Sequence, residues 1–89
     1  MGDVMTDHRE RQFAISGEWA LGSDGLQWIL YQRHRRKGGK DTWDGISFVR
    51  STRDILARCM REKGVPGTVQ ATLLAGLPET FDEWKRALP

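Results

Sequence analysis

Five cations surround a pair of glycines in the middle of the chain, in the stretch Arg-His-Arg-Arg-Lys-Gly-Gly-Lys at residues 33–40. They are Arg33, Arg35, Arg36, Lys37 and Lys40. Such groups neutralise phosphates and aromatic rings stack on bases, so a basic turn beside Trp28 and Tyr31 could bind a nucleic acid. The same charges could bind an acidic protein surface, or could stay solvated and keep the strand edges soluble. The residue types alone leave these three interpretations open.

The segment Gly-Gly-Lys-Asp-Thr at residues 38–42 is similar to the end of a phosphate-binding loop but lacks its essential parts. Such a loop needs an earlier glycine, a Ser or Thr directly after the lysine, and a helix that follows. Here Asp41 follows Lys40, and the pattern beyond it predicts a strand. We therefore exclude nucleotide binding by this loop.

A second group of cations falls in the helix predicted for residues 52–63 and comprises Arg53, Arg58 and Arg61. A basic helix face can lie along phosphates or along an acidic protein surface. The alternative is a solvated face balanced by Asp54 and Glu62. The next predicted helix, at residues 68–75, carries no Arg or Lys, which argues against a helix-turn-helix that reads the major groove of DNA.

The other residues that could do chemistry stand apart from one another. Cys59 lies on the apolar side of its predicted helix with no His at a useful spacing, so we interpret it as a core residue. One Cys with the two isolated histidines, His8 and His34, gives no metal site. The carboxylates at the start of the last predicted helix, where the helix dipole accounts for them, are Glu79, Asp82 and Glu83. We therefore expect no enzyme activity, no metal and no cofactor.

Alternating apolar residues predict a sheet that would present the first group of cations. The alternation runs from Phe13 to Leu21, and we interpret Gly17 within it as a bulge or bend. Turn-prone residues follow at 22–25, and apolar strands are predicted on either side of the basic stretch. We therefore expect a three-stranded antiparallel sheet over about residues 13–50, with the cations at one hairpin.

Capping and stop signals predict two or three short helices after the sheet, at about residues 52–63, 68–75 and 79–88. Ser51 can cap the first helix, Gly64 ends it, and Thr80 with Glu83 forms a capping box for the last. Three strands need a cover to be stable. The expected fold class is therefore α+β, with the helices packed on one face of the sheet.

Length, composition and charge limit the class of protein. The chain has 89 residues, 38% of them hydrophobic, so we expect one small domain at residues 12–89 after a flexible arm at residues 1–11. One cysteine allows no intramolecular disulfide and fits the cytoplasm, and no apolar run is long enough to span a membrane. Residues 33–63 hold ten Lys or Arg against four acids, a net charge of +6 in a chain whose total is +2. Such a basic block can favour an acidic partner, and solvated surface charge gives the same counts.

Three stretches resemble small proteins encoded by bacteriophages and prophages of proteobacteria. They are Gln-Trp-Ile-Leu at residues 27–30, Ser-Phe-Val-Arg-Ser at residues 47–51, and Leu-Ala-Gly-Leu-Pro from residue 74 through to Trp84. The resemblance covers about residues 18–85 and carries over no functional residue. In size and build the chain is also similar in type to anti-CRISPR proteins, which are mostly not enzymes and bind CRISPR effectors where nucleic acid would sit.

This resemblance leads us to expect a small phage-type inhibitor that binds a host protein or ribonucleoprotein complex involved in handling nucleic acids. Its contact residues would be the cations of residues 33–40, followed by Arg53, Arg58 and Arg61. A direct nucleic-acid-binding module that uses the same cations, and a phage assembly protein, are the alternatives. We expect a monomer or a weak dimer.

Overall fold

The computed structural model describes residues 11–35, 38–39 and 41–88. Four strands form one antiparallel sheet in the order β1-β2-β3-β4, and they are β1 (Arg11–Ser16), β2 (Trp19–Ser23), β3 (Trp28–His34) and β4 (Thr42–Val49). Three helices follow, α2 (Arg53–Glu62), α3 (Gly67–Leu74) and α4 (Phe81–Arg86). The predicted α+β class is confirmed, but the sheet has four strands and not three. Of the predicted arm, residues 1–10 lie outside the described residues, and Arg11 begins β1.

The additional strand comes from Gly17, which is part of a hairpin turn and not a bulge. Gly17 has a φ of 61° and, with Glu18, connects β1 to β2, while Ser16 pairs with Trp19 across the turn. A positive φ at the first of two loop residues is typical of a type II′ turn. The apolar alternation keeps its phase through these two residues, so the period alone could not separate a bend from a reversal of the chain.

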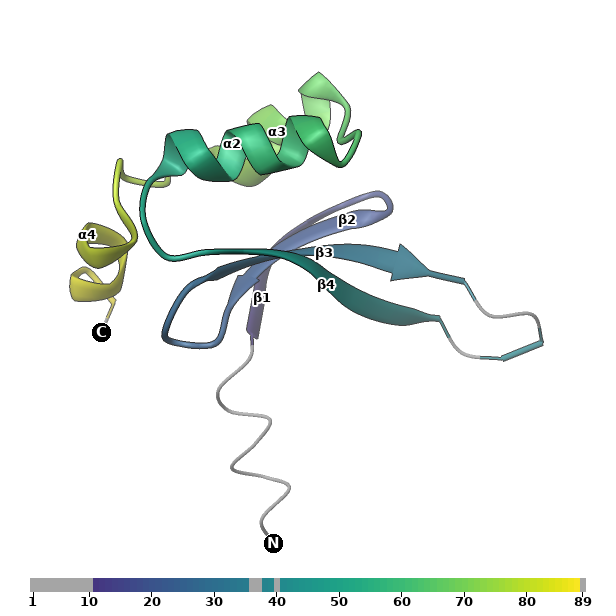
Figure 1. The fold of residues 1–89 in the computed structure, drawn as a ribbon. Helices are drawn as coiled ribbons and strands as arrows, with labels where there is room; N and C mark the ends of the chain where they lie inside the picture. Colours follow the sequence, from purple (N-terminus) through teal and green to yellow (C-terminus); the bar gives the residue numbers. More distant parts are fainter. Residues whose placement is uncertain (1–10, 36–37, 40, 89) are drawn as a thin grey trace, which may run out of the picture.

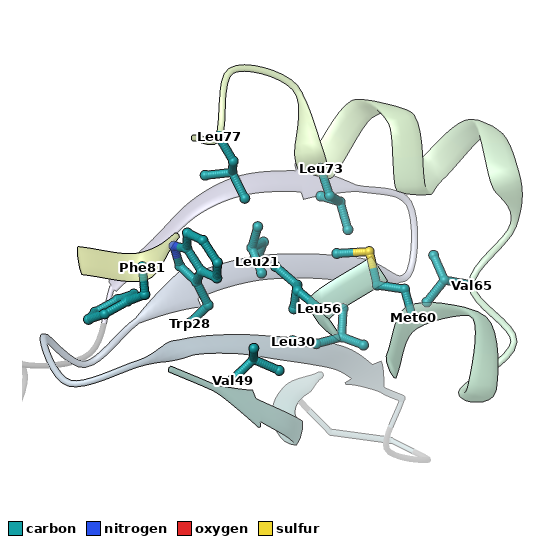
Figure 2. Packing of buried hydrophobic residues seen from close by; sticks show 10 residues of the cluster. All are labelled: Leu21, Trp28, Leu30, Val49, Leu56, Met60, Val65, Leu73, Leu77 and Phe81. Atoms are coloured by element: carbon teal, nitrogen blue, oxygen red, sulfur yellow. The ribbon is translucent and has the colours of Figure 1, made fainter. Parts of the chain in front are cut away.

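The core lies between the sheet and the helices. Helices α2 and α3 lie over one face of the sheet, and α4 lies beside its end (Figure 1). The buried cluster, shown in Figure 2, consists of Leu21, Trp28, Leu30, Val49, Leu56, Met60, Val65, Leu73, Leu77 and Phe81. The Trp28 ring meets the Phe81 ring edge-on, with the centroids 5.5 Å apart. We call the face of the sheet over which α2 and α3 lie the covered face.

Local capping sets the start of two helices. The Thr52 hydroxyl accepts a hydrogen bond from the Ile55 N–H at 3.2 Å, so the cap of α2 is Thr52 and not the predicted Ser51. The capping box predicted for the last helix is confirmed, because the Glu83 N–H donates to the Thr80 hydroxyl at 3.1 Å and the Thr80 N–H donates to the Glu83 carboxylate at 3.2 Å. The two caps are neighbours, since Thr52 and Thr80 form an isolated antiparallel bridge.

Candidate binding surface

The hairpin formed by β3 and β4 projects beyond the layer of helices (Figure 1). Its strands pair Arg33 with Trp43 and His34 with Thr42, so the predicted basic stretch begins in the last two residues of β3 and lies at a hairpin, as expected. Three of the predicted contact residues, Arg36, Lys37 and Lys40, lie outside the described residues. The geometry of the site is therefore that of Arg33 and Arg35.

Arg33 is held in place by contacts on three sides. Its guanidinium carbon lies 4.9 Å from the centroid of the Trp43 ring, and its Nη1 lies 4.0 Å from a carboxylate oxygen of Asp41. Its backbone N–H donates to the carbonyl oxygen of Glu18 at 2.7 Å. A stacked guanidinium interacts favourably with the ring and keeps its donors free at the edge. These contacts of Arg33 therefore hold the base of the β3–β4 hairpin in place at the border of the sheet.

Arg35 reaches the same turn through its side chain. Its Nε and Nη2 donate to the two carboxylate oxygens of Glu18 at 3.3 and 2.7 Å. The hydrogen bond from Arg35 holds the pKa of Glu18 below its usual value, and the same pair raises the pKa of Arg35. Glu18 thus connects the β1–β2 turn to the base of the projecting hairpin through a backbone bond and a two-point ion pair.

These pairs give the predicted contact residues a structural role that the sequence did not reveal. Glu18 precedes Arg35 by 17 residues, and only the register of two successive hairpins brings them together. Acids also face the other described bases of the hairpin, because Asp41 lies beside Arg33 and Asp44 lies 3.6 Å from His34. This compensation weakens the case for phosphate binding by the base of the hairpin.

The second predicted group of cations is divided by the fold. Arg53 is half-buried and donates from Nη1 to the Leu77 carbonyl oxygen at 2.9 Å, which ties the start of α2 to the segment before α4. Arg58 and Arg61 are exposed on α2, and neither forms an ion pair within the described part of the chain. Arg53 therefore has a structural bond in addition to its predicted contact role, whereas Arg58 and Arg61 are exposed without one.

The sequence reasoning missed an apolar surface on the other side of the sheet, which we call the open face because no described helix lies over it (Figure 1). The register places Ile15, Ala20 and Tyr31 in one row and Ile29 and Phe48 in the next. Ala20, Ile29 and Tyr31 are buried there in a small cluster of their own. Ile15 and Phe48 are each 57% exposed.

Two glycines allow the open face to pack closely. A Cβ at Gly22 would overlap the Arg11 carbonyl oxygen and would lie 2.9 Å from the Tyr31 ring. A Cβ at Gly45 would lie 3.1 Å from the Phe48 ring and 3.2 Å from the Ile29 side chain. Both rings therefore lie directly over glycine backbone, in the manner of a packed surface and not of freely solvated side chains.

The sequence did contain a signal for this surface. Residues 28–31 read Trp-Ile-Leu-Tyr without a polar interruption, and all four are buried. A strand with one solvated face alternates, whereas an unbroken apolar run is typical of a strand whose two faces are both apolar. The run in β3 therefore indicated a second apolar face, which the prediction of helices on one side did not include.

In the described residues, no group of three or more His, Cys, Asp or Glu could hold a metal ion. None of the described helices is long and apolar enough to cross a membrane. No protein-family model matches the chain, and neither a curated protein nor a solved structure matches it.

Proposed function

We propose that this chain is a small phage-type inhibitor that acts in the cytoplasm by protein–protein contact with a host complex involved in handling nucleic acids. The observation that carries the proposal is the open face, where Ile15 and Phe48 are exposed around a buried apolar cluster. Exposed apolar surface favours association, because its removal from water contributes roughly 25 cal/mol per Å². The phage origin and the class of target come from the sequence resemblance.

The hairpin supports a role in binding because its base is already ordered. Arg33 stacked on Trp43 borders the open face, and Arg and Trp are the residue types that most often dominate interfaces. The ion pair between Glu18 and Arg35 holds this region to the β1–β2 turn. A surface that is fixed before binding loses less conformational entropy in the complex.

A nucleic-acid-binding module is the second candidate, and one observation favours it. Arg58 and Arg61 are exposed on α2 and form no ion pair within the described part of the chain. Such cations could follow a phosphate backbone. The acids beside Arg33 and Arg35, together with the apolar open face, favour a protein partner.

The proposal is tested by capture of a partner from a nuclease-treated bacterial lysate with the tagged full-length chain. We expect the wild type to retain a protein in stoichiometric amount and Phe48→Ser to lose it. Leu26→Ser is the matched control, because Leu26 is 65% exposed but lies in the β2–β3 turn and not in the strands that form the open face, and it should retain the partner. Recovery of nucleic acid alone from an untreated lysate, with binding that falls steeply as salt rises, would replace the proposal with the second candidate.

A further inference from the structure

Strand β4 is an edge of the sheet whose outer side is free to pair. It is the last strand in the order β1-β2-β3-β4 and, among the described residues, pairs only with β3. No backbone hydrogen bond joins the outer side of β4 to another segment among the described residues. An unpaired row of N–H and C=O groups is a template for an added strand.

Along this edge, apolar side chains lie at the centre of β4 and an arginine lies near each end. The register with β3 places Trp43, Gly45 and Phe48 on that face. The Arg33 guanidinium lies over Trp43 at one end, 4.9 Å from the ring centroid. Exposed Arg50 follows β4 directly at the other end and forms no ion pair within the described part of the chain. The edge therefore presents an apolar centre between Arg33, which has Asp41 4.0 Å from its Nη1, and Arg50.

We propose that an extended acidic segment of the partner protein adds to β4 as a fifth strand, with its apolar side chains against Phe48 and its carboxylates at Arg33 and Arg50. This inference rests on the proposed function and defines the chemistry of the partner. Backbone hydrogen bonds along β4 provide the affinity, and the alternation of side chains provides the specificity.

The register sets the spacing that the partner needs. On an added strand, every second residue faces the open side. Ile46 is an extra residue on β4, because β3 pairs Leu30 with Ser47 and the next residue, Tyr31, with Gly45. An added strand that skips Ile46 in the same way places the residues opposite Arg50, Phe48, Gly45 and Trp43 at positions one, three, five and seven of the partner segment. The outer two should be acidic and the inner two apolar. Because this pattern is symmetrical, it fits a strand that runs in either direction.

A second copy of the chain fits this edge less well than an acidic segment. Antiparallel pairing of two β4 strands about a two-fold axis would bring Arg50 of each copy near Arg33 of the other. Like charges placed opposite each other across a strand pair are destabilising. Carboxylates of an acidic segment at the same places would instead form favourable pairs with the arginines.

The experiment measures fluorescence anisotropy of a labelled heptapeptide, Glu-Thr-Val-Thr-Val-Thr-Glu, titrated with the full-length chain at low salt. We expect saturable binding that Phe48→Ala weakens by about fivefold. A peptide with Lys in place of both Glu residues should bind about tenfold more weakly. A peptide N-methylated at alternate residues, which blocks the backbone bonds, should also bind about tenfold more weakly. Ile55→Ala on α2 is the control and should leave the affinity unchanged.

Equal binding of the N-methylated peptide would overturn strand addition, and equal binding of the Lys peptide would overturn the acidic chemistry. Absence of binding would overturn the inference as a whole. Dimerisation of the free chain through Phe48, detected by light scattering, would assign the edge to a second copy. If the heptapeptide does not bind but the lysate experiment still yields a partner whose capture depends on Phe48, the proposed function stands and only the mode of binding is wrong.

Discussion

The two faces of the sheet are built from the same strands but differ in how far they are covered. Strand β3 contributes Trp28 and Leu30 to the covered face and Ile29 and Tyr31 to the open face. The covered face is closed by α2 and α3, whereas on the open face Phe48 remains 57% exposed. Stability should therefore depend mostly on one face and binding on the other, so that substitutions can separate the two properties.

The largest effect should come from the covered face. Leu56 on α2 is fully buried against the sheet, and Leu56→Ala should lower the free energy of unfolding by about 2–5 kcal/mol. Urea denaturation measures this change. Ile55→Ala, at the adjacent exposed position of the same helix, is the control and should change stability by about 0.5 kcal/mol or less. Similar losses for both variants would contradict the assignment of the covered face.

A second substitution tests how tightly the open face is packed. Gly22→Ala should lower the free energy of unfolding by about 1–3 kcal/mol, because the added methyl group would meet the Arg11 carbonyl oxygen and the Tyr31 ring. Gly67→Ala at the start of α3 places the same group in open space and should stabilise the fold by about 0.4–1 kcal/mol. Thermal or urea unfolding of both variants should give changes of opposite sign.

Phe48 should contribute to binding far more than to stability. We expect Phe48→Ser to change the free energy of unfolding by less than about 1 kcal/mol, because the residue is already 57% exposed. Unfolding curves check this expectation, and the lysate experiment checks binding. A large loss of stability would mean that the ring serves mainly as a cover for Ile29, and the two faces would then not be separable at this position.

Features set by local sequence could be predicted, whereas features set by pairing between distant residues could not. The Thr80–Glu83 capping box and the hairpin around the basic stretch depend on neighbouring residues and were predicted. The β1–β2 turn was not, because the apolar alternation keeps its phase past Gly17 whether the chain bends or reverses there. Which arginines form hydrogen bonds or ion pairs within the fold also depends on contacts between segments far apart in sequence, and this could not be predicted.

The contact residues illustrate this division. Composition identified Arg33, Arg35 and Arg53 as cations that could meet a partner, but their bonds to Glu18 and Leu77 depend on tertiary structure. The open face was indicated by the apolar run in β3, yet its exposure depends on which side the helices cover. Contacts with a partner remain predictions for the whole set, which is Arg33, Arg35, Arg36, Lys37, Lys40, Arg53, Arg58 and Arg61.

The smallest effect concerns the ion pair that connects the two regions. The hydrogen bond from Arg35 lowers the pKa of Glu18 from its ordinary value of 4.5. A carboxyl group whose pKa is lowered by folding stabilises the fold above its unfolded pKa, and this contribution disappears as the pH falls through the lower folded pKa. Arg35 stays protonated throughout this range, so the charge of Glu18 alone controls the pair.

We therefore expect the melting temperature of the wild type to fall more than that of Glu18→Gln between pH 6 and pH 3. The other carboxyl groups are common to both proteins, so the difference between the two pH profiles isolates this pair. The difference should be small and should shrink in high salt, because the pair is exposed to water. Glu18→Gln also removes the ion pair that holds the base of the hairpin. At neutral pH it should therefore reduce the amount of captured partner, while the melting temperature changes little. Parallel pH profiles with unchanged capture would show that the hairpin is positioned by the backbone bond from Arg33 to Glu18 and not by this ion pair.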